Sequence, residues 1–243
     1  MKKIIKENLL LNGVHKARSA IINFNNNYLD GYSKKSYSHE GEDMILRSMF
    51  EKQKNGFYID VGAHHPKRFS NTYYFYKKGW RGINIDAMPG SMNLFKKIRK
   101  RDINLEIPIS DKEETVNYYI FNELAANTFS DELAKEKLKN EGRYIRAEKY
   151  LKCKTMAQVL GEYLPVNQSI DFLSVDTEGY DLKVLKSNNW EKYVPECVLV
   201  EVIGLSIEDL INSELTHFMK DNGYVLFSKI LNTIIYKKRI SSL

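Results

Sequence analysis

Residues Phe57–His64 read FYIDVGAH, an apolar run that ends in an acid and a glycine. A short apolar run of this kind favours a strand that is buried on both faces of a parallel sheet. Gly62 lets the backbone turn tightly and approach a ligand closely. Asp60, Gly62 and Ala63 therefore predict a strand followed by a ligand-binding turn, and the helix beyond that turn favours an anionic group at its N-terminus.

Strand and helix patterns alternate along most of the chain, which predicts an α/β fold with a mostly parallel, doubly wound sheet. Two final strands separated by Leu231 and Asn232 predict an antiparallel hairpin at the C-terminus. The expected strands are 57–62, 82–86, 103–109, 115–121, 171–175, 198–202, 224–230 and 233–238, and the expected helices are 41–51, 71–78, 91–100, 181–187 and 208–220.

Two segments stand apart from this alternation. Residues 1–36 carry apolar positions at helical spacing and predict an N-terminal helical extension, which packs on the domain or joins two chains into a homo-oligomer. Residues 122–150 are charged, helix-prone and without a strand pattern, so we expect a helical insertion that covers the active site. The remaining residues of 37–243 form the main domain.

The composition is that of an ordinary globular protein, with 243 residues, 43% hydrophobic and 28% charged. The net charge of +6 permits a polyanionic partner, but the lysines are scattered and favour a solvated surface over a nucleic-acid site. Cys153 and Cys197 lie far apart and predict no disulfide framework, which fits a reducing cytoplasm. No secretory signal is visible, and no apolar run approaches the ~20 residues that span a bilayer.

Asp86 ends the second predicted strand, beside the first. An acid at this place can accept hydrogen bonds from both hydroxyls of a ribose, as in NAD sites. A dinucleotide site also expects glycines in the pattern G-x-G-x-x-G, whereas this chain places His64, His65 and Pro66 after Gly62. These bulky residues disfavour a pyrophosphate. S-adenosylmethionine has a ribose and no phosphate, so a methyltransferase is favoured over a dehydrogenase.

Five segments together resemble the FkbM family of methyltransferases. The resemblance implies a Rossmann-like class I methyltransferase fold, S-adenosylmethionine as methyl donor, and usually O-methylation of a sugar or a secondary metabolite. The matching segments are Ser38–Leu46 (SHEGEDMIL), Tyr58–Tyr73 (YIDVGAHHPKRFSNTY), Gly79–Asp86 (GWRGINID), Phe172–Leu185 (FLSVDTEGYDLKVL) and Val198–Glu201 (VLVE).

Three acids follow the fourth and fifth core strands. Asp176 and Glu178 belong to the fourth, and Glu201 ends the fifth. Parallel neighbouring strands end at one edge of the sheet, so these carboxylates converge near the donor methyl group and repel one another. A divalent cation would compensate this, either Mg or Mn, or Fe if His65 is also a ligand. Catalytic roles are expected for Asp176, Glu178 and His65, and metal binding for Asp176, Glu201 and His65.

Each acid also has a structural alternative. Asp176 could cap the following helix, Glu178 could pair with Lys183 or Arg68, and Glu201 could orient another residue. Without a metal, Asp176 or His65 would act as the general base for the acceptor hydroxyl.

Further cofactor contacts are expected around the first turn. Asn71 opens the next predicted helix close to that turn, although it could serve only as a cap. Ser110 follows the third strand and is expected beside the adenine, through its backbone as much as through its side chain. The family resemblance suggests that the segment with Ser38 and Glu42 covers the cofactor, with Glu42 at its amino group. His65 is preferred to His64 for the chemistry because the following proline restricts its backbone.

The preferred function is O-methylation of a sugar hydroxyl on a nucleotide-linked or glycan precursor, assisted by a divalent metal. Arg143, Arg146 and Lys149 could bind a phosphate, although a solvated helix face is the favoured explanation for them. The alternatives are a metal-independent methyltransferase of another metabolite, a nucleic-acid methyltransferase, and a non-enzymatic subunit that binds S-adenosylmethionine.

Overall fold

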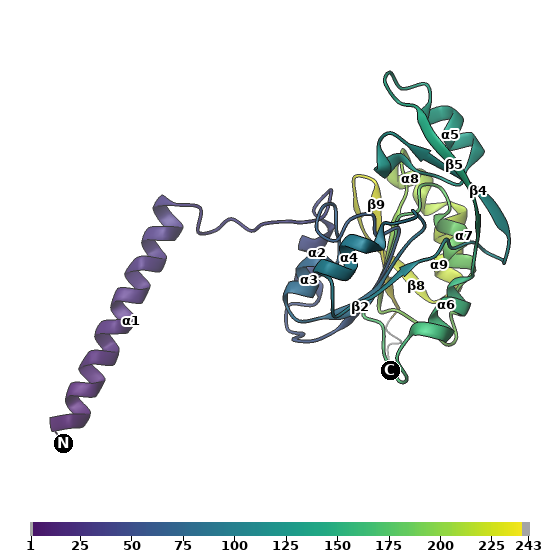
Figure 1. The fold of residues 1–243 in the computed structure, drawn as a ribbon. Helices are drawn as coiled ribbons and strands as arrows, with labels where there is room; N and C mark the ends of the chain where they lie inside the picture. Colours follow the sequence, from purple (N-terminus) through teal and green to yellow (C-terminus); the bar gives the residue numbers. More distant parts are fainter. Residues whose placement is uncertain (1, 240–243) are drawn as a thin grey trace. The chain divides into compact units, whose positions relative to one another are not determined.

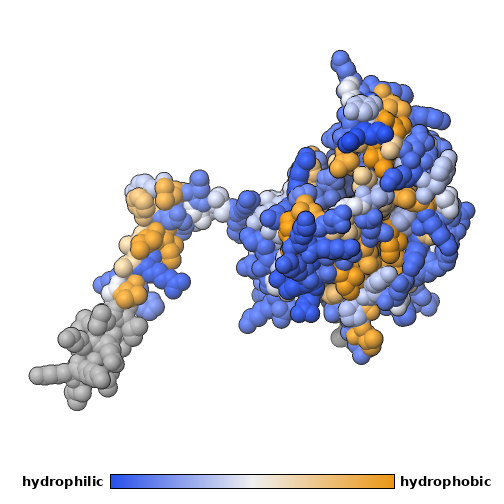
Figure 2. Space-filling view, in the orientation of Figure 1, coloured by the Kyte–Doolittle hydropathy of each residue, from blue (hydrophilic) through white to orange (hydrophobic). Residues whose placement is uncertain are grey.

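A computed structural model describes residues 2–239, and the chain forms two compact units, residues 1–36 and 37–243. The first unit contains one helix, α1 (Lys2–Tyr28). Large apolar side chains lie exposed on its described part, among them Val14, Ile21 and Phe24 (Figure 2). Within the described residues, none of the helices combines the length and the apolar character needed to cross a membrane.

The second unit is built on a seven-stranded sheet with the order β3-β2-β1-β6-β7-β9-β8 (Figure 1). The first five strands are parallel, and β9 pairs antiparallel with both β7 and β8. This confirms the predicted fold class, including the C-terminal hairpin. The strands are β1 (Phe57–Val61), β2 (Arg81–Asp86), β3 (Ile103–Glu106), β6 (Phe172–Val175), β7 (Cys197–Glu201), β8 (Tyr224–Ile230) and β9 (Thr233–Lys238).

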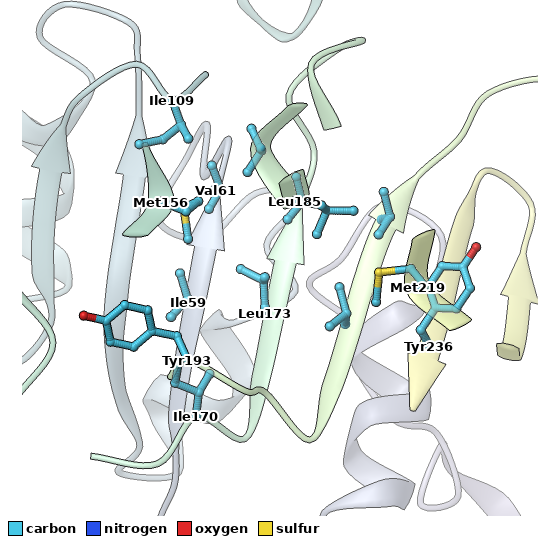
Figure 3. Close-up of a cluster of buried hydrophobic side chains, with 14 of the residues drawn as sticks. Ile59, Val61, Ile109, Met156, Ile170, Leu173, Leu185, Tyr193, Met219 and Tyr236 are labelled. Carbon is cyan, nitrogen blue, oxygen red and sulfur yellow. The ribbon is translucent and has the colours of Figure 1, made fainter. Parts of the chain in front are cut away.

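Helices cover both faces of the sheet, which is why its central strands are apolar throughout. One face packs α6 (Met156–Tyr163), α7 (Asp181–Lys186), α8 (Ile207–Ile211) and α9 (Glu214–Asp221), and the other packs α2 (Glu42–Met49) and α3 (Tyr73–Lys77). Helix α4 (Met92–Ile98) follows β2. Figure 3 shows the first of these cores, in which Ile59, Val61 and Leu173 of neighbouring strands lie against Met156 and Leu185.

The prediction of one helix over 208–220 is wrong, because the structure has two helices there. Ser213 lies between α8 and α9. Its side chain accepts a hydrogen bond from the backbone N–H of Thr216 and so caps the N-terminus of α9. Helix α6 lies outside every predicted helix. It begins at Thr155, where Gln158 completes a capping box.

The segment predicted as a purely helical insertion, residues 122–150, contains a strand. It has a short 3-10 turn (Leu124–Ala126) and α5 (Asp131–Lys137), and then β5 (Ile145–Lys152), which pairs antiparallel with β4 (Thr115–Phe121). These two strands form a sheet of their own, separate from the main one. Most of β5 is exposed, so its charged residues do not show the apolar alternation that predicts a strand.

Candidate active site

A cavity of about 290 Å³ lies at the carboxyl ends of the central parallel strands. The order of the strands reverses between β1 and β6, and open α/β sheets bind ligands at such a point. Five other parts of the chain contribute to the wall: residues of 39–42, of 64–71, of 107–109 and of 118–129, and Thr233 at the start of β9. The sequence predicts this edge of the sheet as the site, and the cavity lies there.

Gly62 lines the cavity at the tight turn after β1, with a φ of 82° that suits glycine. A Cβ atom at this position would lie 1.6 Å from the carbonyl oxygen of Asp176, so no other residue fits without movement of one loop. The backbone N–H groups of Gly62 and Ala63 donate to the carbonyl of Ile85 at 2.9 and 3.0 Å. Ala63 itself is buried in a small apolar cluster and lies outside the described cavity lining.

Asp86 lines the cavity at the end of β2. One carboxylate oxygen accepts from the N–H of Met88 and the other from the N–H of His64, both at 2.8 Å. Burial raises the pKa of Asp86, and these two hydrogen bonds counteract the rise. Each oxygen keeps a second lone pair, so the fixed carboxylate can still accept from two ribose hydroxyls.

Ser110 does not lie where the sequence predicts it. Its hydroxyl is buried and donates to Glu114 at 2.7 Å and to Asp111 at 3.2 Å, away from the described cavity lining. The cavity wall near Asp86 is instead formed by Ile107 and Ile109. Side chains alternate along extended backbone, so facing Ile109 into the cavity turns Ser110 away.

Asn71 lines the cavity, whereas Asp60 does not. Asp60 is buried and accepts from the hydroxyl of Thr72 at 2.8 Å, and its burial raises its pKa to about 6. Asn71 donates through Nδ2 to Ser174 at 3.0 Å, and its buried Oδ1 atom has no hydrogen-bond partner in the protein. A buried acceptor without a partner is costly, and an ammonium group in the cavity would satisfy it.

The segment before α2 supplies Glu42 but not Ser38 to the cavity. Glu42 is buried, accepts from the hydroxyl of Thr233 at 3.0 Å, and also accepts from the N–H of Glu40 at 2.9 Å. Ser38 donates to Asp43 at 3.0 Å and lies outside the described cavity lining. Glu42 therefore joins the start of α2 to the C-terminal hairpin above the sheet edge.

Asp176, Glu178 and Glu201 come together as the sequence predicts. Each offers a carboxylate oxygen, and these oxygens lie within 4.8 Å of one another. Asp176 lines the cavity with an exposed side chain, whereas Glu178 and Glu201 are partly buried. Partial desolvation by the surrounding protein and the facing Glu201 carboxylate raise the pKa of Asp176, and desolvation together with Glu178 raises the pKa of Glu201. Three carboxylates this close repel one another when they are ionised, and a divalent cation between them would relieve that repulsion.

Glu178 is fixed by the segment between β4 and β5. Its carboxylate forms an ion pair with Lys137 at 2.6 Å, and the same ammonium donates to the carbonyl of Ala126 at 3.1 Å. The carbonyl oxygen of Glu178 accepts from the hydroxyl of Thr128 at 2.8 Å. Its partner is thus a residue of α5, so the acid cluster and this segment are joined.

His64, and not His65, faces the cavity. The Nδ1 atom of His65 accepts from the N–H groups of Lys67 and Arg68 at 3.1 and 2.9 Å, so His65 stabilises a turn and lies outside the acid cluster. His64 has a φ of 49°, in the left-handed region, and burial lowers its pKa. The sign of this φ decides which ring faces inward, and no sequence pattern indicates it.

The cavity wall also contains residues to which the sequence pattern gave no role in the site, among them Phe69 and His39. Phe69 lies at the cavity with the ring of His39 at 4.4 Å and the guanidinium of Arg68 at 4.3 Å from its centroid. Arg68 is the only Arg or Lys in the cavity lining of the described chain. The basic group expected from the sequence lies elsewhere: Arg143, Arg146 and Lys149 are outside that lining, and Arg143 pairs with Glu123 at 2.7 Å.

The chain matches the methyltransferase FkbM domain over residues 60–226, which is more than half of its length. No curated protein sequence matches it.

Solved methyltransferase structures resemble the fold. The Burkholderia thailandensis 1,6-didemethyltoxoflavin-N1-methyltransferase, with bound S-adenosylhomocysteine, is 11% identical with a TM-score of 0.42 and covers 94% of this chain and 90% of its own. The precorrin-6y C5,15-methyltransferase of Geobacter metallireducens is 14% identical with a TM-score of 0.41 and covers 86% and 93%. At these TM-scores the likeness says nothing about the substrate.

Proposed function

Because the chain belongs to the methyltransferase FkbM family, whose cofactor is S-adenosylmethionine, we propose that it methylates a sugar hydroxyl on a nucleotide-linked or glycan precursor. The convergence of Asp176, Glu178 and Glu201 beside the Gly62 turn carries this proposal. A hydroxyl is a weak acid, so its methylation needs a base that removes the proton or a metal ion that lowers the pKa of the hydroxyl. Methylation of a nitrogen that already carries a lone pair has no such need.

The cavity residues fit the cofactor. Asp86 would accept from the ribose hydroxyls, and Ile107 and Ile109 offer an apolar wall for the adenine. The unpartnered Oδ1 atom of Asn71 would accept from the cofactor's ammonium group. When bound, S-adenosylmethionine supplies an electrophilic methyl group on a sulfonium centre. Because Gly62 has no Cβ atom, the turn after β1 can lie directly against the backbone of Asp176.

In the metal-independent alternative, Asp176 is proposed as the group that receives the acceptor proton. Its pKa is raised by desolvation and by the facing Glu201, so its ionised form is a stronger base than an ordinary carboxylate. Glu178, held by Lys137, would keep its place while the neighbouring acids exchange the proton. His65 is not proposed for this role, because it lies outside the described cavity lining and outside the acid cluster.

A divalent cation is proposed as the partner of the three acids. Three carboxylate oxygens within 4.8 Å of one another suit a hard cation such as Mg²⁺ or Mn²⁺. Such an ion would remove the mutual repulsion and lower the pKa of a bound hydroxyl. Iron was expected only with a histidine ligand, and neither His64 nor His65 belongs to the cluster of possible ligands in the described chain, so iron is not proposed.

The substrate class is supported by Arg68 and its neighbours. A guanidinium binds phosphate oxygens in bidentate fashion, and it is here the sole Arg or Lys of the described cavity wall. Phe69 and His39 present rings beside it, on which a sugar or base can stack. A nucleotide-linked sugar carries both groups. A non-sugar metabolite methylated without a metal is the alternative.

The test incubates the purified protein with S-adenosylmethionine and a panel of nucleotide-linked sugars, and detects methylated products by mass spectrometry. We expect a product that disappears after chelation and returns with Mg²⁺ or Mn²⁺. Asp176→Asn should lower turnover by about 100-fold or more, as for loss of a general base, while cofactor binding persists. Full turnover after exhaustive chelation would show that no metal is required. Full turnover of Asp176→Asn would show that this residue has no part in the mechanism. Products formed only with other hydroxyl compounds would favour the alternative.

A further inference from the structure

A fully buried arginine lies beneath the turn that follows β1. Arg99, just after α4, donates through Nε to Asp102 at 2.8 Å and through Nη2 to the hydroxyl of Tyr58 at 2.8 Å and to Asn84 at 3.3 Å. Tyr58 and Asn84 belong to β1 and β2, so the guanidinium is fixed against the two strands that flank the cofactor turn. A buried cation needs this degree of pairing to be tolerated.

The same guanidinium also holds the loop of residues 62–72. Its Nη1 atom donates to the carbonyl of Pro66 at 3.0 Å, and Nη2 donates to the hydroxyl of Thr72 at 2.9 Å. That hydroxyl donates in turn to Asp60 at 2.8 Å. The loop is therefore attached to the sheet at its middle and at its end.

The loop of residues 62–72 contains strained backbone, which the hydrogen bonds from Arg99 help to hold in place. His64 and Phe69 within it have φ values of 49° and 57°, a left-handed region that costs energy for residues other than glycine. Gly62 and Asn71, at the two ends of the loop, are the residues that meet the cofactor in the proposed site. Asn71 directly precedes Thr72, so a shift of Thr72 would move the unpartnered Oδ1 atom of Asn71.

We propose that Arg99 and Thr72 are positioning residues for S-adenosylmethionine, and that Asp60 acts on the cofactor only through Thr72. The role rests on the proposed placement of Asn71 at the cofactor. Asp60, the acid of the FYIDVGAH stretch, thus belongs to a buried network that holds the loop in shape. None of the three residues lines the described part of the cavity, so each acts without touching the cofactor.

The test replaces Thr72 by Val, which keeps the shape and removes the hydroxyl, and by Ser, which keeps the hydroxyl. Thr216→Val is the matched control. Thr216, on α9, is also fully buried, and its hydroxyl forms a 2.7 Å hydrogen bond with the buried Tyr236 of β9. Arg99→Lys is a second variant, which keeps the charge but cannot donate to so many partners. Binding of S-adenosylmethionine by calorimetry, thermal unfolding, and the split between KM and kcat are measured for each.

Thr72→Val should raise the Kd and the KM for S-adenosylmethionine by about tenfold, the effect of one lost hydrogen bond to charged groups, with kcat at saturation unchanged. Arg99→Lys should do the same, and Thr72→Ser should bind like the unchanged protein. Thr216→Val should lose thermal stability without any change in Kd. The role is overturned if Thr72→Val and Arg99→Lys bind the cofactor with unchanged affinity. Absence of binding by the unchanged protein would instead overturn the cofactor site itself.

Discussion

Gly62 lies where two loops touch, the turn after β1 and the turn that carries Asp176. The contact is made by backbone, since the carbonyl of Asp176 occupies the space that a Cβ atom of residue 62 would need. One glycine therefore sets the distance between the proposed cofactor and the proposed base. Its φ of 82° adds a second reason for glycine, independent of the first.

A comparison of Gly62→Ala with Gly142→Ala separates the cost of the positive φ from the cost of the clash with the carbonyl of Asp176. Gly142 has a similar φ of 78°, but an added Cβ atom would meet nothing within 4 Å. Gly142→Ala should lose about 1 kcal/mol of unfolding free energy, the cost of a left-handed alanine, and keep its affinity for S-adenosylmethionine. Gly62→Ala should lose several times more and bind the cofactor poorly. Urea unfolding and calorimetry measure both, and equal losses for the two variants would contradict the steric argument.

The sequence predicts well which residues lie at this edge of the sheet. It predicts less well in which direction their side chains point. Asp86, Asn71, Glu42 and the three acids line the cavity, because each lies at the end of a strand, in the loop just beyond one, or at or before the start of a neighbouring helix. Side-chain direction depends on φ at single residues and on hydrogen bonds to distant residues, which leave no local pattern. The predicted site residues that face elsewhere are Asp60, Ala63, Ser38, Ser110 and His65.

The small sheet of β4 and β5, with α5 between its strands, contributes directly to the site. Tyr118 and Phe129 of this segment stack at 4.6 Å and form part of the cavity wall. Lys137 of α5 reaches the acid cluster through Glu178. The segment therefore shapes the cavity and fixes one of its acids.

Lys137→Gln should lower kcat/KM by about tenfold, the order expected from loss of a part-buried charge-assisted hydrogen bond. Arg143→Gln is the control, since its ion pair with Glu123 lies in the same segment but is largely exposed on the Glu123 side. A pair of that kind contributes little, so this variant should keep nearly full activity. Steady-state kinetics on both proteins decide the matter, and an unchanged Lys137→Gln would show that Glu178 needs no such anchor.

The described cavity wall runs from His39 to Thr233, so it belongs entirely to the unit of residues 37–243. The unit of residues 1–36 supplies none of the described lining. Its helix α1 carries exposed apolar side chains, which suits the predicted role in joining two chains.

Removal of residues 1–36 should leave cofactor affinity and thermal unfolding of the remaining protein close to those of the full chain. If α1 joins two chains, sedimentation should show a smaller assembly after its removal. The reason is that the sheet, both of its cores and the cavity lie within 37–243. Loss of cofactor binding in the shortened protein would show that residues 1–36 belong to the site.

Local pattern was sufficient to predict the parallel sheet, its closing hairpin and the edge at which the acids meet, because buried strands and the alternation of elements leave their mark on neighbouring residues. Long-range contacts were needed for the rest. Pairing with β4 makes a strand of the charged residues 145–152, and Asp60 is engaged outside the cavity lining by Thr72, which Arg99 holds in turn. Both depend on residues distant in sequence, whose meeting is fixed only when the chain has folded. The FYIDVGAH stretch thus marks the site, while a buried arginine and threonine beneath it set its shape.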